Sequence, residues 1–184
     1  MSAFDRVREH LLAHAVRHGQ FTLKSGRTST WFIDAKQTIS APEVMVDVAT
    51  LLLEHVPASA TAIGGLTMGA DGATYVTAAV AATRGRYLRA FSVRKELKDH
   101  GAGGRSAGVL EPGDLVVITE DTVTRGTSLL EAARVVREAG AQIALLLALV
   151  DRGGTAAELA AEEGWPFEAV FGAPDLGLPY EGAS

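Results

Sequence analysis

The stretch that decides the fold is LVVITEDTVTRGTSLLEAARVVREAGAQIALLLALV, residues 115–150. It begins with a short apolar strand, followed by a turn rich in threonine and glycine. An amphipathic helix comes next, with an apolar face formed by Leu129, Ala132, Ala133, Val136 and Ala139. The last part, residues 141–150, is an almost unbroken apolar run, which is typical of a strand buried on both faces. A strand, a helix and a second strand in this order predict a parallel βαβ unit.

The same alternation extends to both sides of this unit. We expect further strands at residues 60–65, 87–93 and 167–172, and helices near residues 70–83 and 154–163. Before them, the pattern predicts a helix over residues 3–18 ended by Gly19, a hairpin within residues 20–38 and a helix over residues 42–56. Residues 94–108 contain four glycines and predict a loop. The fold class is therefore α/β, a mostly parallel central sheet flanked by helices, in a single domain over residues 1–184.

The composition is that of an ordinary globular domain. The 184 residues are 47% hydrophobic and 21% charged, carry a net charge of −5 and include no cysteine, which excludes disulfides and thiol catalysis. No apolar run approaches ~18 residues and the first residues do not form a signal-peptide pattern, so we expect no membrane partner and a cytoplasmic location. The negative net charge argues against nucleic acid as a partner.

One segment departs from this acidic balance. Residues 84–105 hold seven Arg or Lys against two acidic residues, a local charge of +5. Arg94, Lys95, Lys98 and His100 belong to it and lie next to a glycine-rich run. A solvated surface is one interpretation. The other is a mobile lid that closes on a small anionic ligand, such as a polyphosphate leaving group.

The turn after the first strand of the opening stretch combines two chemistries. Glu120 and Asp121 come first, and the hydroxyls of Thr124, Thr127 and Ser128 follow at the start of a helix. The N–H groups of a helix N-terminus bind phosphate, whereas ionised carboxylates accept hydrogen bonds from hydroxyl groups. A ribose 5-phosphate has both groups, one at each end, and therefore satisfies the whole turn. The alternative is an ordinary N-cap made by threonine or serine.

A second glycine-rich turn, GGLTMGAD at residues 64–71, also follows a predicted strand. Such a turn binds an anion through its backbone N–H groups or serves chain geometry alone. The carboxyl ends of parallel strands share one edge of a sheet. We therefore expect both turns, the cationic segment and the DRGG stretch at residues 151–154 to meet there.

Residues 116–128, VVITEDTVTRGTS, resemble the phosphoribosyl diphosphate (PRPP) signature of type I phosphoribosyltransferases. Four further stretches resemble, in order, motifs of the orotate phosphoribosyltransferase family: FTLKSGRTSTWFIDAK (21–36), GGLTMGAD (64–71), VRKELKDHGAGG (93–104) and LVDRG (149–153). The PRPP signature alone indicates the superfamily, whereas the RKELKDHG loop together with FTLKSG is far more specific to the orotate enzymes. The resemblance covers residues 21–153.

The resemblance implies the type I phosphoribosyltransferase fold with a small hood, formed by residues 1–40 and the C-terminal strand, that binds the base. It implies transfer of 5-phosphoribosyl from PRPP to N1 of orotate, which gives orotidine 5′-monophosphate and diphosphate in pyrimidine biosynthesis. Mg²⁺ is the implied cofactor, held mainly through PRPP. In the family the mobile loop reaches the neighbouring subunit, which implies a homodimer with shared active sites.

The resemblance also implies roles for individual residues. Glu120 and Asp121 would bind the ribose hydroxyls, and Asp121 would also manage the N1 proton of orotate. The 5-phosphate would be held by Thr122, Val123, Thr124, Arg125, Gly126, Thr127 and Ser128. PRPP would further contact Lys24, Arg94, Lys95, Lys98 and His100. The implied catalytic residues are Lys98, His100 and Asp121, and the implied orotate site is Phe32, Ile33, Thr124 and Arg152.

One position departs from the pattern of some members. Met68 stands where they carry a lysine, which removes a cation from the diphosphate site, although the backbone of Thr67, Met68 and Gly69 can still bind diphosphate. Two alternatives stay open. A phosphoribosyltransferase for another nucleobase would need neither Arg152 nor the RKELKDHG loop. A non-catalytic regulator that binds PRPP or a nucleotide would be favoured by loss of the loop cations, which are all present here.

Overall fold

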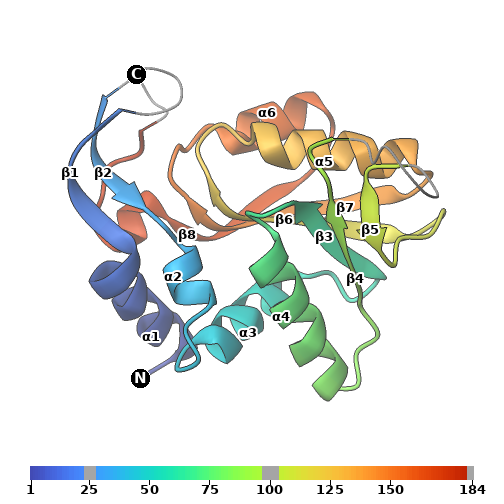
Figure 1. Ribbon diagram of the computed structural model, residues 1–184, viewed down its shortest axis with the longest axis horizontal. Helices are drawn as coiled ribbons and strands as arrows, with labels where there is room; N and C mark the ends of the chain where they lie inside the picture. The colour runs from blue at the N-terminus through green and yellow to red at the C-terminus, as the bar shows by residue number, and fades with distance from the viewer. Residues whose placement is uncertain (23–27, 97–103, 182–184) are drawn as a thin grey trace.

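The computed structural model describes residues 1–22, 28–96 and 104–181. Its centre is a six-stranded sheet in the order β5-β4-β3-β6-β7-β8 (Figure 1). The strands are β3 (Ala62–Leu66), β4 (Arg89–Val93), β5 (Ser106–Gly108), β6 (Leu115–Val123), β7 (Gln142–Asp151) and β8 (Phe167–Gly172). All neighbours pair in parallel except β5, which is antiparallel to β4. The mostly parallel sheet predicted from the sequence is confirmed.

Helices cover both faces of this sheet (Figure 1). They are α3 (Met45–His55) and α4 (Asp71–Thr83) on one face, and α5 (Thr127–Glu138) and α6 (Ala156–Glu162) on the other. Alternate residues of a strand point to opposite faces. Leu145 and Leu147 of β7 therefore join the core beside α3 and α4, while Leu146 and Ala148 join the core beside α5 and α6. This two-sided burial explains the unbroken apolar sequence of β7.

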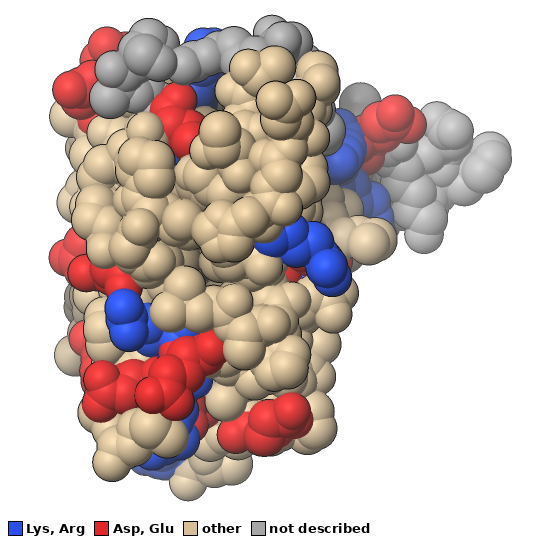
Figure 2. All heavy atoms as spheres, turned by 90° about the vertical axis from the view of Figure 1, so that its left-hand side faces the viewer, with Lys and Arg blue, Asp and Glu red and all other residues tan. Residues whose placement is uncertain are grey.

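A smaller unit stands beside the sheet, and we call residues 1–40 the hood. It consists of α1 (Ala3–His10), a π-helical turn (Leu11–Ala15), β1 (Val16–Thr22), β2 (Thr28–Ile33) and α2 (Lys36–Ile39). β1 and β2 pair in antiparallel fashion, which confirms the predicted hairpin, although its turn lies outside the described residues. Seen from the hood side, the surface has uncharged atoms in the middle and both signs of charge around them (Figure 2). The described part of this face therefore mixes acidic and basic side chains instead of forming one broad cationic surface.

The first helical segment ends earlier than the sequence pattern indicates. Helical structure stops at Ala15, and β1 begins directly after it and contains Gly19, the residue expected to end the helix. The first residues of β1 pair with Trp31 and Ile33 of β2, both of which are buried. Pairing with a strand anchored in the core outweighs the helical spacing of these residues.

The predicted loop at residues 94–108 contains the short strand β5, which the sequence does not indicate. Its three residues take up strand structure by pairing with β4, where Phe91 lies opposite Gly108. Gly108 has φ +98°, and a side-chain carbon at this position would lie 2.7 Å from the main-chain oxygen of Ala90. Close approach to β4 therefore requires the glycine, and this contact is not visible in the local sequence.

The C-terminal strand lies in the central sheet and not in the hood where it was expected. β8 pairs in parallel with β7 as an edge strand, because its apolar residues complete the sheet. It still packs on the hood, since Phe171 stacks on Phe4 of α1 with ring centroids 4.4 Å apart. The segment after β8 begins with a 3₁₀ turn (Ala173–Leu176) and runs back to the hood hairpin (Figure 1).

The parallel strands β3, β4, β6 and β7 end at one edge of the sheet, as the sequence predicts. The turn after β6 and the start of the loop after β7 lie at this edge and share a cavity with residues of the hood. Within the described ranges, no helix combines the length and the apolar character needed to cross a bilayer.

Candidate active site

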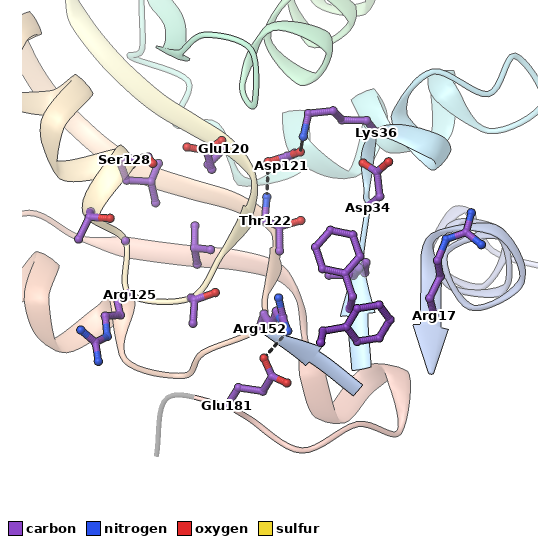
Figure 3. Close-up of a pocket in the computed structure, with 18 of the residues that line it drawn as sticks. Arg17, Asp34, Lys36, Glu120, Asp121, Thr122, Arg125, Ser128, Arg152 and Glu181 are labelled. Carbon is purple, nitrogen blue, oxygen red and sulfur yellow. Dashed lines mark hydrogen bonds and ion pairs between the residues drawn. The ribbon is translucent and has the colours of Figure 1, made fainter. Parts of the chain in front are cut away.

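A cavity of about 900 Å³ lies between the hood and the carboxyl edge of the sheet (Figure 3). The hood contributes Arg17, Phe21, Thr22, Phe32, Ile33, Asp34 and Lys36 to its lining. The sheet side contributes residues 120–129, Arg152 and Glu181. All residues of the predicted PRPP turn, from Glu120 to Ser128, thus face the same cavity as the predicted base-site residues.

The turn between β6 and α5 forms an open helix N-terminus. The N-cap of α5 is Gly126 in the left-handed conformation, and it has no side chain that could cap the first N–H groups. Thr127 and Ser128 are the first two residues of the helix and do not cap it. The ordinary Thr or Ser N-cap is therefore not formed, and the first turn of α5 is free to bind an anion through its N–H groups.

A close backbone contact holds this turn in place. A side-chain carbon at Gly153 would lie 1.7 Å from the main-chain oxygen of Thr124, so the loop after β7 touches the turn directly. Thr155 adds a hydrogen bond from its hydroxyl to the same oxygen at 3.1 Å. The conformation of the PRPP turn thus depends on a loop about 30 residues later in the chain.

The carboxylate pair is almost completely buried. Glu120 is 7% exposed and Asp121 is 6% exposed. The Glu120 carboxylate packs on the backbone of Gly69, where an added side-chain carbon would lie 1.9 Å from Oε1. Burial raises the pKa of Glu120 to about 8, and the neighbouring charge of Asp121 raises it as well, whereas Lys36 lowers it. Glu120 therefore keeps its proton to a higher pH than an exposed glutamate does.

Asp121 is held by two partners. Its Oδ1 accepts a hydrogen bond from the N–H of Thr122 at 2.8 Å, and its Oδ2 forms an ion pair with Lys36 Nζ (Figure 3). Burial lowers the pKa of Lys36, but the hydrogen bond and the charge of Asp121 outweigh this effect and raise it. Lys36 therefore stays charged and links the hood to the carboxylate pair.

Sequence reasoning did not assign a role to Lys36, Asp34 or Arg17, which all line the cavity. Lys36 lies inside the FTLKSGRTSTWFIDAK motif, but a single lysine at the end of a predicted hairpin gives no sign of its partner. Its contact with Asp121 joins residues 85 positions apart. Only the docking of the hood on the sheet reveals it.

Arg152 is a buried cation at the hood side of the cavity, only 5% exposed. Its Nη2 donates to the main-chain oxygen of Trp31 at 2.8 Å and to Ser29 Oγ at 3.2 Å, and it forms an ion pair with Glu181. Its guanidinium carbon lies 5.7 Å from the ring centroid of Phe32. Burial lowers the pKa of Arg152 from its usual value, and Glu181 partly offsets this effect. Such an arginine is suited to a planar ligand with a negative charge.

Two polar atoms of the cavity wall are buried without a hydrogen-bond partner among the described residues, namely Thr122 Oγ1 and Arg152 Nε. Buried donors of this kind are rare unless they serve a ligand or water. Phe32 is partly exposed and tilts against Phe21, with ring centroids 5.7 Å apart, whereas Trp31 is buried in the core. The cavity therefore offers both polar and aromatic contacts to a ligand near Phe32 and Arg152.

Of the other predicted residues, those that the structure describes are not among the residues that line this cavity. Thr67, Met68 and Gly69 follow β3, and Met68 is 73% exposed. Arg94 and Lys95 follow β4, where Arg94 Nη1 donates to the main-chain oxygen of Ser106 at 3.2 Å. Lys24, Lys98 and His100 lie outside the described residues. Over the part of the chain that the structure describes, no group of three His, Asp or Glu side chains could hold a metal ion.

The raised pKa of Glu120 predicts a pH effect on stability. A carboxyl whose pKa rises from 4.5 to about 8 on folding stabilises the protein fully below pH 4.5, and this contribution is lost as the pH rises through 8. We expect the free energy of unfolding of the wild type to fall by a few kcal/mol between pH 5 and pH 8.5 relative to Glu120→Gln, at about 1.4 kcal/mol per pKa unit. Denaturant unfolding of both proteins at pH 5 and pH 8.5 measures this difference in unfolding free energy.

Glu162→Gln is the matched control, since Glu162 is exposed on α6. The free energy of unfolding of this variant should equal that of the wild type at both pH values. Equal pH dependence of Glu120→Gln and the wild type would contradict the prediction.

Comparison with known proteins identifies relatives by sequence and by structure. No family model matches the chain. The chain is 37% identical to the orotate phosphoribosyltransferase of Synechocystis sp. over 173 residues, which cover 93% of this chain and 87% of that protein. The orotate phosphoribosyltransferase of Mycobacterium tuberculosis in complex with Fe(III) dicitrate is similar in structure, with a TM-score of 0.83 and 31% identity over 96% of this chain and 99% of that one.

The Mycobacterium tuberculosis enzyme in complex with PRPP is also similar, with a TM-score of 0.80 and 28% identity over 96% of this chain and 99% of that one. The likeness therefore extends over nearly the whole of both chains in sequence and in structure. The chain belongs to the orotate phosphoribosyltransferase family.

Proposed function

We propose that this chain transfers the 5-phosphoribosyl group of PRPP to N1 of orotate, which yields orotidine 5′-monophosphate and diphosphate. The observation that carries the proposal is the combination of groups in one cavity. An open helix N-terminus and a carboxylate pair fit a ribose phosphate. A buried arginine beside an exposed aromatic ring fits a flat base with a carboxylate. Membership of the family supports the same reaction.

The phosphoribosyl end of PRPP binds the turn between β6 and α5. The 5-phosphate accepts hydrogen bonds from the N–H groups at the start of α5 and from the hydroxyls of Thr127 and Ser128. The ribose hydroxyls bind Glu120 and Asp121. Each carboxylate oxygen has two acceptor sites, so Asp121 can hold Lys36 and the Thr122 N–H and still accept a ribose hydroxyl.

Orotate binds at the other end of the cavity. Its ring lies against Phe32, and the backbone of Phe32 and Ile33 hydrogen-bonds its polar edge. Its carboxylate binds Arg152, with Thr124 as a further donor. The hood, residues 1–40, thus supplies much of the base site, and the segment after β8 joins it through Glu181.

The reaction exchanges one bond at C1′ for another. The C1′–oxygen bond breaks first and its electron pair leaves with diphosphate, and then N1 of orotate attacks C1′ while its proton passes to Asp121. Lys98 and His100, with Arg94, Lys95 and the backbone of residues 67–69, stabilise the charge on diphosphate. Mg²⁺, which prefers oxygen ligands, would be held mainly through PRPP and would supply further charge neutralisation there. Closure of the cavity excludes water, which would otherwise hydrolyse PRPP.

Lys98→Ala should lower kcat on the order of a hundredfold and raise KM for orotate much less, because the lysine acts on charge that grows on the leaving group. Steady-state kinetics with either substrate varied measures both quantities. Arg84→Ala removes a surface cation of the same charged segment and should keep the wild-type kcat. An unchanged kcat in Lys98→Ala would remove this lysine from the mechanism.

An assay with four bases tests the function directly. Orotate, uracil, adenine and hypoxanthine are each offered with PRPP and Mg²⁺, and diphosphate release is measured. We expect release with orotate. Release with another base and not with orotate would assign the chain to a different nucleobase. No release with any base would favour a non-catalytic regulator.

The proposal includes a cytoplasmic homodimer with shared active sites and a single domain over residues 1–184. Mixing Lys98→Ala with Asp121→Asn tests the sharing. If the loop acts across the dimer, mixed dimers contain one intact site, and activity returns to about a quarter of the wild-type value when subunits exchange at random. No recovery in dimers proven to be mixed would mean that the loop acts within its own subunit.

A further inference from the structure

Glu181, near the C-terminus, lies in the cavity against Arg152 (Figure 3). Its carboxylate forms an ion pair with Arg152 Nη2, and Ser29 Oγ of β2 donates to the same carboxylate. Its N–H also donates to the main-chain oxygen of Arg152 at 3.1 Å. The side chains of Arg152 and Glu181 are only 6% and 11% exposed. The chain therefore places one of its own carboxylates on the buried cation of the base site.

Tyr180, the residue before Glu181, holds the C-terminal segment in place through its own contacts. The ring of Tyr180 lies on Gly154, where an added side-chain carbon would be 2.9 Å from the ring, and its hydroxyl lies 2.5 Å from such a carbon at Gly172. Both glycines leave the space that the tyrosine occupies. Tyr180 and the backbone hydrogen bond thus hold the segment at the sheet edge independently of the Glu181 side chain.

The ion pair neutralises the buried charge of Arg152. A buried arginine without a counter-charge is strongly destabilising. Glu181 supplies that counter-charge, and it does so with the same chemical group that orotate carries. Two carboxylates on one buried guanidinium repel each other, so the presence of one weakens the binding of the other.

We propose that Glu181 is an internal competitor that sets the affinity for orotate. The proposal rests on the proposed function. Glu181 occupies Arg152 while the base site is empty and leaves it when the carboxylate of orotate arrives. The apparent dissociation constant of orotate is then the intrinsic constant divided by the fraction of molecules in which Glu181 has left the arginine. The last described residues of the chain thereby set how tightly the base site binds orotate.

Glu181→Gln tests the competition, because glutamine keeps the shape and a hydrogen-bonding oxygen but loses the charge. We expect the dissociation constant of orotate, measured by calorimetry, to fall about 3- to 30-fold while KM for PRPP stays unchanged. A chain that ends at Pro179 removes the carboxylate together with its anchor and should bind orotate more tightly as well. Thermal unfolding by circular dichroism establishes that both variants are folded.

Glu162→Gln is the matched control, an exposed glutamate outside the cavity, and should bind orotate like the wild type. Unchanged orotate affinity in both folded variants would overturn the proposal. Weaker binding would overturn it too, since it would mean that Glu181 orients Arg152 for orotate. Failure of the proposed function is a separate result: the wild type would release no diphosphate from PRPP and orotate.

Discussion

Arg152→Gln is expected to lower kcat/KM for orotate by about two to three orders of magnitude. Loss of one partner from a buried, hydrogen-bonded charge pair costs ~2–5 kcal/mol, and ~1.4 kcal/mol corresponds to a factor of ten. Arg152 has this environment, since it is 5% exposed and lies beside Phe32. KM for PRPP should change little, because the phosphate-binding turn keeps its contacts. Steady-state kinetics with each substrate varied in turn measures the effect.

The substitution also leaves Glu181 buried without its cation, and this side effect needs a control. The double variant Arg152→Gln, Glu181→Gln removes both charges and should regain stability without regaining orotate activity. Arg134→Gln removes a half-exposed arginine of α5 that pairs with Glu163 and should behave like the wild type. If kcat/KM for orotate in Arg152→Gln stays within fivefold of the wild type, Arg152 does not bind the carboxylate.

Gly153→Ala is expected to raise KM for PRPP at least a hundredfold. The new methyl group would lie 1.7 Å from the main-chain oxygen of Thr124, so one of the two loops has to move by more than an ångström. A misplacement of about 1 Å in a site that positions substrate costs on the order of a hundredfold in rate. Stability should fall as well, by ~1–3 kcal/mol, as for other overpacked sites. Initial rates at varied PRPP concentration and denaturant unfolding measure the two effects.

Gly85→Ala separates this clash from a general effect of replacing glycine. Gly85 follows α4, has φ +73° and has no atom within 4 Å of an added side-chain carbon. Its replacement should cost only ~1 kcal/mol of backbone strain and leave KM for PRPP unchanged. A KM for PRPP in Gly153→Ala within threefold of the wild type would show that the Thr124 contact does not control the turn.

The element pattern could be predicted because its causes are local. The apolar run of β7 and the one-sided apolar face of α5 each follow from the period of a single element. The common edge at which β3, β4, β6 and β7 end also needed only the rule that parallel strands end together. Predictions failed where a distant partner decided the structure. The end of the first helix and the strand β5 both depend on pairing with other strands.

The candidate site was predictable to a similar extent. The turn from Glu120 to Ser128 could be interpreted from its own chemistry, and the structure places all of it in one cavity with Phe32 and Arg152. The contacts that decide how this cavity works could not be found in this way. Lys36 and Asp121 are 85 positions apart, and Arg152 and Ser29 are 123 positions apart.

The sequence by itself determined a mostly parallel α/β sheet with a turn rich in glycine and hydroxyl groups and a carboxylate pair at its edge, because period, glycine and hydroxyl content act over a few residues. The tertiary structure alone decided the charge state of the site. Burial raises the pKa of Glu120 to about 8, Lys36 from the hood holds Asp121, and Glu181 from the C-terminal segment holds Arg152. Burial and ion pairing depend on which distant segments the fold brings together, and no local pattern in the sequence records them.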